Sequence, residues 1–185
     1  MACLRSRLKP QGGRLNLTLI DAMPHPATLG ANLRSWFEKN LIVHLPPHSL
    51  SHTPTCLFPK CLGAACLRGP GSKRVKTKFF ASPESIRGGV ISEEEQQHED
   101  HDPDPAIRKL RSELRVKAEL RCLVGRMLWM EVWGTHISPR VGKRSAGGDD
   151  EDVVPWWWDD EACMTECLQL GTFWEYHTIE AVRGP

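Results

Sequence analysis

The stretch DPAIRKLRSELRVKAELRCLVGRM, residues 104–127, gives the clearest structural signal in this chain of 185 residues. Its apolar residues first recur at intervals of three and four, the spacing of one face of an α-helix. They are Ile107, Leu110, Leu114 and Ala118. Asp104 can cap the first turn, and Pro105 stands where proline is tolerated in a helix. We therefore expect a central helix over about residues 105–124.

Two further features of this helix bear on function. Beyond its middle the apolar residues move to the opposite side, at Val116, Leu120, Leu123 and Met127. A helix that is apolar on two faces either lies between partners or is interrupted, here at Gly125. Cations also follow one flank, at Arg108, Arg111, Arg115 and Arg126. Such a row suits nucleic-acid phosphates, since guanidinium groups bind phosphate oxygens in pairs, but it also suits an anionic membrane, an acidic protein or water.

Along the whole chain, positive and negative charges are segregated. Residues 1–90 hold 13 Lys and Arg against 3 Asp and Glu, whereas residues 91–185 hold 11 against 20. Blocks of one sign repel themselves and attract partners of opposite charge. Leu, Ile, Val and Phe make up only about 23% of the chain, close to the level of disordered proteins. We therefore expect a largely disordered, weakly α+β protein with no large core.

The remaining elements are short. Alternation predicts a strand over 15–20, and helical spacing predicts a helix over about 29–43. Prolines and glycines favour a loop over 46–72, and 73–80 is strand-like. Asp160 and Gly171 can bound a helix over 161–170, and 172–182 has strand composition. We divide the chain into a strand–helix cluster (1–45), a loop with a basic and then an acidic run (46–104), a helical segment (105–134) and an acidic Trp-rich tail (135–185).

A regular set of histidines and cysteines lies in the predicted loop. It comprises His44, His48, His52, Cys56, Cys61 and Cys66. Imidazole and thiolate are ligands that zinc prefers, and a metal can organise a segment that lacks a core. The spacing matches no usual zinc finger, and Pro46, Pro47 and Pro54 exclude one continuous helix through the set. A small zinc-binding module is therefore an alternative to incidental His and Cys in a loop.

Two other segments favour binding partners. Lys73, Arg74, Lys76 and Lys78 match the minimal basic pattern that nuclear import receptors bind. Residues 149–161 hold seven acids around Val153, Val154 and three consecutive tryptophans, Trp156, Trp157 and Trp158. One face of a helix or strand cannot bury three adjacent indoles, so we expect exposed tryptophans that dock on a protein.

No phosphate-binding glycine loop, zinc-protease motif or nucleophile-elbow motif is present in the sequence, so we expect no enzymatic activity and no cofactor apart from the zinc alternative. No apolar run is long enough for a membrane span, and we expect a nuclear or cytoplasmic protein that is not secreted. The sequence favours a non-enzymatic regulatory or interaction protein that binds a protein and, through its basic segments, an import receptor or nucleic acid. A third interpretation is a young, lineage-restricted open reading frame product without a refined function.

Overall fold

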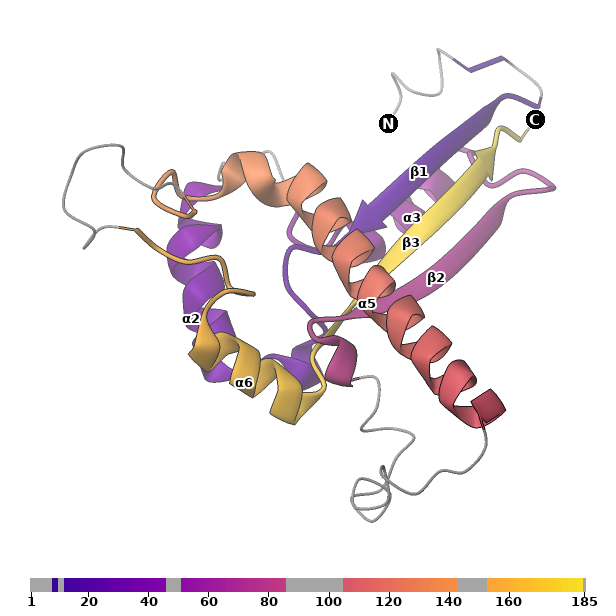
Figure 1. The fold of residues 1–185 in the computed structure, drawn as a ribbon. Helices are drawn as coiled ribbons and strands as arrows, with labels where there is room; N and C mark the ends of the chain where they lie inside the picture. The colour runs from indigo at the N-terminus through magenta and orange to yellow at the C-terminus, as the bar shows by residue number, and fades with distance from the viewer. Residues whose placement is uncertain (1–7, 10–11, 46–50, 86–104, 143–152, 185) are drawn as a thin grey trace. The chain divides into compact units, whose positions relative to one another are not determined.

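The computed structural model describes residues 8–9, 12–45, 51–85, 105–142 and 153–184. They form a mixed α+β structure of helices and a three-stranded sheet (Figure 1). The chain divides into two compact units. The first, here the sheet unit, comprises Met1–Met23, Pro47–Lys78 and Trp174–Pro185; the second, the helical unit, comprises Pro24–Pro46 and Phe79–Phe173. Each unit therefore combines segments that are far apart in the sequence.

The sheet contains β1 (Arg14–Ile20), β2 (Lys73–Phe80) and β3 (Phe173–Val182) in the order β1-β3-β2. The strands β1 and β3 pair antiparallel, with Arg14 opposite Val182 and Ile20 opposite Tyr176. The strand β3 is therefore central, which agrees with its alternating buried residues. The three predicted strand segments are confirmed to within a residue at each end.

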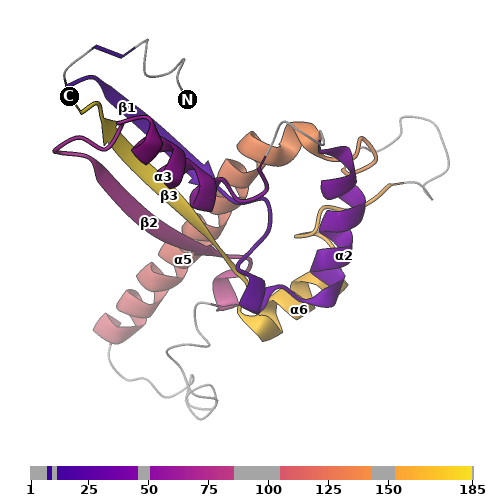
Figure 2. The same cartoon turned by 180° about the vertical axis from the view of Figure 1, so that it is seen from behind.

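The helix α3 (Pro54–Ala64) corrects the prediction of a loop over 46–72. Pro54 occupies the first turn, where its missing N–H is not needed. Pro59 lies inside the helix and would ordinarily destabilise it. The helix forms nonetheless because its apolar side chains pack in the core of the sheet unit. Figure 2 shows α3 lying on one face of the sheet. The buried residues of this core are Leu19, Leu62, Leu67, Ile179 and Ala181.

The first turn of α3 is capped by the carboxylate of Asp21, the residue that follows β1. Asp21 accepts hydrogen bonds from the Thr55 backbone N–H at 3.0 Å and from the Thr55 hydroxyl at 2.6 Å. Backbone N–H groups in the first turn of a helix have no partner within the helix, so this distant acid satisfies one of them. The prolines and glycines of 46–72 are typical of a loop, and the group that caps α3 lies 34 residues away in the chain, so α3 has no local signal in the sequence.

The helical unit contains α2 (Ala31–Asn40), α5 (Pro105–Trp133) and α6 (Glu161–Leu170), with single 3₁₀ turns at Pro26–Thr28, Ile42–His44, residues 83–85 and Gly134–His136. The predicted 161–170 helix is confirmed. Asp160 accepts from the Cys163 N–H at 2.9 Å, and Gly171 ends the helix in the left-handed conformation, with φ of 59°. The predicted helix over 29–43 is confirmed in a shorter form, as α2.

The expectation of a largely disordered chain without a large core is wrong for the described residues. The helical unit buries Leu33, Phe37, Leu41, Trp129 and Trp157, among others. The fraction of Leu, Ile, Val and Phe underestimates this core because much of it consists of Trp and Cys. A tryptophan buries as much surface as any side chain, and five of the seven are buried. The acidic run over 93–104 lies outside the described residues.

Candidate interaction surface

The helix α5 continues without a break from Pro105 to Trp133, so of the two alternatives for a helix with two apolar faces, the interruption at Gly125 is wrong. Gly125 is buried against the side chain of Phe79, and a β carbon at position 125 would overlap the Phe79 ring. The glycine therefore permits close packing of the helix rather than ending it. Cys122, Trp129 and Trp133 are buried on the same side of α5.

Arg126 anchors this buried side. Its guanidinium donates a hydrogen bond of 2.6 Å to the Ala81 carbonyl oxygen. It also lies 5.6 Å from the ring centre of Trp157 and 5.9 Å from that of Trp158, within cation–π range. Burial lowers the pKa of Arg126. These contacts hold the half-buried Arg126 side chain against its own chain, so the structure gives no support to its predicted place in a phosphate-binding row.

The three adjacent tryptophans are also placed differently from the prediction. Trp157 has no exposed surface, and Trp156 and Trp158 are half-buried, as are Val153 and Val154. The indoles of Trp156 and Trp158 stack with centres 4.7 Å apart, and Trp158 contacts the ring of Trp129 edge-on at 6.4 Å. The segment is a turn, with the Trp156 carbonyl accepting from two following N–H groups, so the indoles need not share one helical or strand face. Trp157 is a core residue and not a docking residue.

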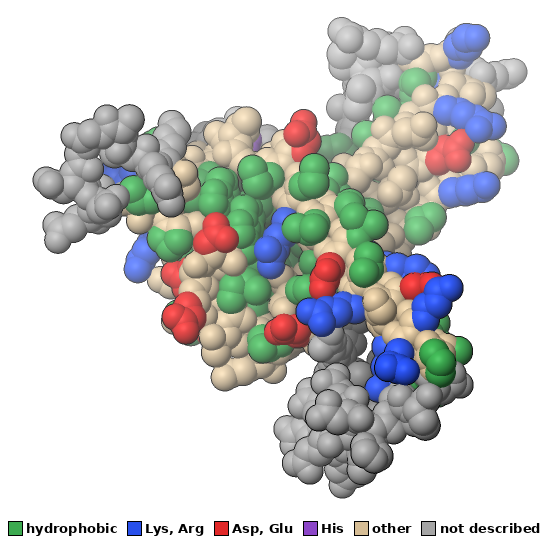
Figure 3. Space-filling view, viewed as in Figure 1, with side chains coloured by type: hydrophobic (Ala, Val, Ile, Leu, Met, Phe, Trp, Pro, Cys, Tyr) green, Lys and Arg blue, Asp and Glu red, His purple; other side chains and the backbone are tan. Residues whose placement is uncertain are grey.

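The opposite side of α5 is apolar and exposed. We call this set the outer face; it comprises Val116, Leu120, Leu123, Met127 and Met130. The spacing of four, three, four and three residues aligns them along one side of the helix, since each residue turns it by about 100°. They lie roughly opposite Cys122 and Trp129. Met127 is 70% exposed and Leu120 is 58% exposed, and Figure 3 shows hydrophobic side chains gathered along this helix.

Cations border the outer face. The helix contains seven Lys and Arg against three Glu. Arg108, Arg115 and Lys117 are exposed, and Arg115 forms an ion pair of 2.9 Å with Glu119 along the helix. Figure 3 shows Lys and Arg clustered toward the amino end of α5. The surface is thus an apolar stripe with a net positive border.

The first predicted stripe of α5 is exposed as well. Ile107, Leu110 and Leu114 lie on the side that is buried farther along the helix, but at 42–57% exposure they contact no core. Both stripes follow from the sequence, except for Met130. The regular four-and-three spacing would have identified Met130 too, had the predicted helix not ended near 124.

The histidine and cysteine set does not form a metal centre in the described part of the chain, where no three His, Cys, Asp or Glu side chains are close enough to hold an ion. Cys56 and Cys61 lie in α3, five residues and hence about 140° apart around the helix. Cys66 follows the helix with φ of 55°. His48 lies outside the described residues. The zinc alternative therefore has no structural support.

The basic segment Lys73, Arg74, Lys76 and Lys78 forms β2 rather than an unpaired extended chain. All four residues are exposed, and Lys76 lies 3.8 Å from the Glu175 carboxylate on β3. Import receptors need an extended segment with accessible backbone. The strand supplies the extended geometry, but β3 already occupies one of its two edges.

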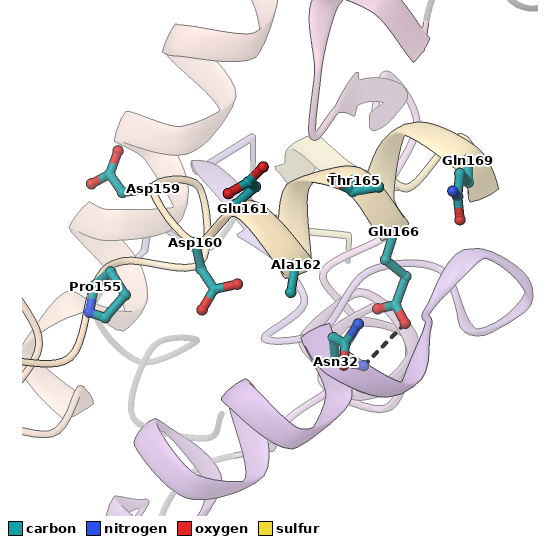
Figure 4. Close-up of a pocket in the computed structure, with 9 residues that line it drawn as sticks. All are labelled: Asn32, Pro155, Asp159, Asp160, Glu161, Ala162, Thr165, Glu166 and Gln169. Carbon is teal, nitrogen blue, oxygen red and sulfur yellow. Dashed lines mark hydrogen bonds between the residues drawn. The ribbon is translucent and has the colours of Figure 1, made fainter.

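Acidic residues surround an open hollow of about 680 Å³ in the helical unit (Figure 4). Two of its acids already have structural roles. Glu166 accepts from the N–H groups of Asn32 and Leu33, each at 3.0 Å, and so caps α2, while Asp160 caps α6. The remaining acids, Asp159 and Glu161, do not by themselves define a ligand.

Within the described residues, no helix combines the length and apolar character that crossing a membrane requires. Comparison with protein-family models, with curated proteins and with solved structures gave no match. The functional argument therefore rests on the surfaces described above.

Proposed function

We propose that this chain is a non-enzymatic interaction protein whose helix α5 docks in an apolar groove of an acidic partner protein. The observation that carries the proposal is the outer face, an exposed apolar stripe at regular helical spacing on the side of α5 that faces away from its own core. Contiguous exposed apolar surface of this kind marks binding sites in soluble proteins.

The regular spacing supports a helix-in-groove mode of binding. Partners of this class receive side chains at intervals of three and four residues, because these intervals align along one side of a helix. Val116, Leu120, Leu123 and Met127 meet that requirement over three turns. The unbranched methionines adapt to grooves of irregular shape.

The charge of α5 supports an acidic partner. With seven cations against three acids, the helix would attract carboxylates on the rim of a groove. Opposite charge around an apolar contact raises the association rate and selects among partners. A basic or neutral groove would gain the same apolar contact without this selection.

The proposal is tested by photocrosslinking the full chain in cells. A benzophenone amino acid replaces Leu123 on the outer face and, in a matched control, Leu168, which is 43% exposed on α6. We expect one protein to crosslink from position 123 and not from 168. The double variant Leu120→Gln, Met127→Gln should abolish that crosslink while leaving the circular dichroism spectrum unchanged, because both side chains are exposed.

Three outcomes contradict the proposal. Equal crosslinking from both positions would mean that the outer face has no special role. A crosslink only to nucleic acid or lipid would assign α5 to a different kind of partner. A crosslink that survives the double variant would place the contact elsewhere on the chain.

Nucleic-acid binding is a second candidate function. Arg108, Arg111 and Arg115 are exposed along one flank of α5, the arrangement that phosphate contact requires. Replacing the three with Gln should weaken binding to duplex or single-stranded probes by about tenfold or more, and added salt should weaken it steeply. Binding that is insensitive to both would exclude this candidate.

We further propose that the protein acts in the nucleus and that Lys73 and Arg74 support its import. The support is the exposed, extended basic strand. A fluorescent fusion of the full chain should accumulate in the nucleus, and the variant Lys73→Gln, Arg74→Gln should lose that accumulation. An unchanged distribution would remove the import role.

A further inference from the structure

The sheet unit has a large excess of positive charge. Its three segments contain 11 Lys and Arg but only three acids, Asp21, Glu175 and Glu180. The charge segregation along the sequence is therefore also a segregation between compact units. The positive charge of the sheet unit favours anionic partners, and this preference does not depend on what α5 binds.

All three acids of the sheet unit are already engaged. Asp21 binds Thr55 at the start of α3. Glu175 lies 3.8 Å from the Lys76 ammonium, and Glu180 accepts from Arg14 at 2.7 Å. No acid within this unit therefore remains to neutralise its other cations.

Three of these cations surround one cleft. The cleft has a volume of about 700 Å³ and lies between the end of α3, the turn that follows it, and strands β2 and β3. Arg68, Lys73 and Arg74 line it, and none of them forms an ion pair with a described carboxylate. Lys73 and Arg74 belong to the predicted basic segment, whereas Arg68 lies in no recognisable motif.

The floor of the cleft is apolar. It is formed by Leu62, Leu67, Ile179 and Ala181, residues of the sheet unit's core. These four side chains have at most 5% of their surface exposed, so the floor is a small apolar contact that suits one short apolar side chain and does not open into a channel for a long acyl chain. A ligand that fits must combine negative charge with a single apolar group.

The strand β2 adds a third property. It is an edge strand, because the order β1-β3-β2 leaves β3 on one side of it and no described strand on the other. Lys73, Arg74 and Lys76 are exposed along it. An edge strand can pair with an extended peptide through backbone hydrogen bonds, while adjacent pockets select its side chains.

We propose that this cleft binds an extended acidic segment of a partner protein, which pairs with β2 and places one apolar side chain on the floor. Carboxylates on either side of that apolar residue meet Arg68, Lys73 and Arg74. Nucleic acid fits less well, since it has neither a peptide backbone to pair with β2 nor an aliphatic side chain for the floor. The site lies wholly in the sheet unit and does not depend on the function proposed for α5.

The test measures binding of a fluorescent peptide to the full chain by anisotropy. The probe carries Asp and Glu on both sides of a single central Leu. Two matched peptides replace that Leu with Ser or methylate the backbone nitrogens that strand pairing requires. We expect the probe to bind, and each altered peptide to bind about fivefold or more weakly.

Two double variants of the protein complete the test. Lys73→Gln, Arg74→Gln removes two exposed cations of the cleft, and Lys9→Gln, Lys60→Gln removes two exposed cations of the same unit that do not line it. We expect affinity to fall about fivefold or more for the first pair and to change little for the second, because screened surface charges act mainly over short distances.

Each contrary result overturns the proposal. An equal loss for both protein variants would mean attraction to net charge alone. Equal binding of the Ser peptide would exclude the apolar floor, and equal binding of the methylated peptide would exclude strand pairing. No binding of the probe at low salt would eliminate the site, whereas photocrosslinking from Leu123 reports on α5 separately.

Discussion

The ring of Phe79 occupies the space that a side chain at Gly125 would need. The contact joins the middle of α5 to the end of β2 within the helical unit. It explains why a residue that weakens helices stands in the centre of a 29-residue helix. Close approach of the two segments is possible only when one of them contributes no β carbon.

Replacing Gly125 with Ala should therefore destabilise the protein even though alanine favours helices. The helix gains up to about 1 kcal/mol of propensity, but overpacking against an aromatic ring costs about 1–3 kcal/mol. We expect a net fall in the free energy of unfolding, measured by urea titration. The control Gly134→Ala meets only an ordinary contact with Met130 and should change little. A more stable Gly125→Ala variant would refute the packing described.

The cap that Glu166 provides for α2 gives a second prediction. Its carboxylate accepts two backbone N–H bonds, from Asn32 and Leu33. Hydrogen bonds to a charged group contribute about 1.5–3 kcal/mol when the partner group is lost. We expect Glu166→Ala to lower the free energy of unfolding by about 1–2 kcal/mol in urea, whereas exposed Glu131→Ala should have little effect. Equal stability of the two variants would contradict the cap.

The stability of the sheet unit should depend on pH through His177. Burial lowers the pKa of His177 below its ordinary value of 6.5, and nearby Arg74 and Lys76 lower it further, against an opposing effect of Glu175. The unfolded chain then binds a proton more readily than the folded one, so the free energy of unfolding falls as pH drops below about 6.5. Urea titrations between neutral and mildly acid pH measure this slope.

The variant His177→Gln should lose much of that slope, because glutamine does not titrate. His52→Gln is the matched control, since His52 is exposed in the same unit. If the two variants keep the same pH dependence as the original chain, another group must cause it.

Cysteine reactivity should report burial directly. Burial raises the pKa of Cys163 to about 12 and that of Cys167 to about 11, and Cys122 is raised as well. Cys56 and Cys66 are exposed. Since the thiolate is the reactive form, iodoacetamide at neutral pH should label Cys56 and Cys66 first, and the three buried thiols only in denaturant. Mass spectrometry that finds uniform labelling in the native protein would contradict the core of the helical unit.

The elements that could be predicted well from the sequence are those whose signals lie within the element or directly beside it. The helix α6 has its cap at Asp160 and its left-handed glycine at Gly171, both within one turn of its ends. The strand β1 shows its alternation within seven residues. The start of α5 at Pro105 follows from the tolerance of proline at the first position of a helix. None of these predictions required knowledge of another segment.

The candidate surfaces were predictable only in part. The two apolar stripes of α5 could be found in the sequence, because helical spacing fixes which residues share a side. The buried side of α5, with Cys122, Gly125, Trp129 and Trp133, belongs to neither stripe and could not be predicted, since it depends on Phe79 and the Trp156–Trp158 turn reaching the helix. The cleft beside β2 was not predictable, because its floor comes from α3 and β3, more than a hundred residues apart.

Most helix and strand ends, and the uneven distribution of charge, follow from the order of the residues alone. Caps, turns and alternation act between neighbouring residues, so a single pass along the chain detects them. Contacts between distant segments are needed to explain that α3 forms despite Pro59, that Trp157 is buried and Arg126 is held against Ala81, and that Arg68, Lys73 and Arg74 share a cleft. These outcomes depend on burial, and burial is set by contacts between segments that the order of residues does not bring together.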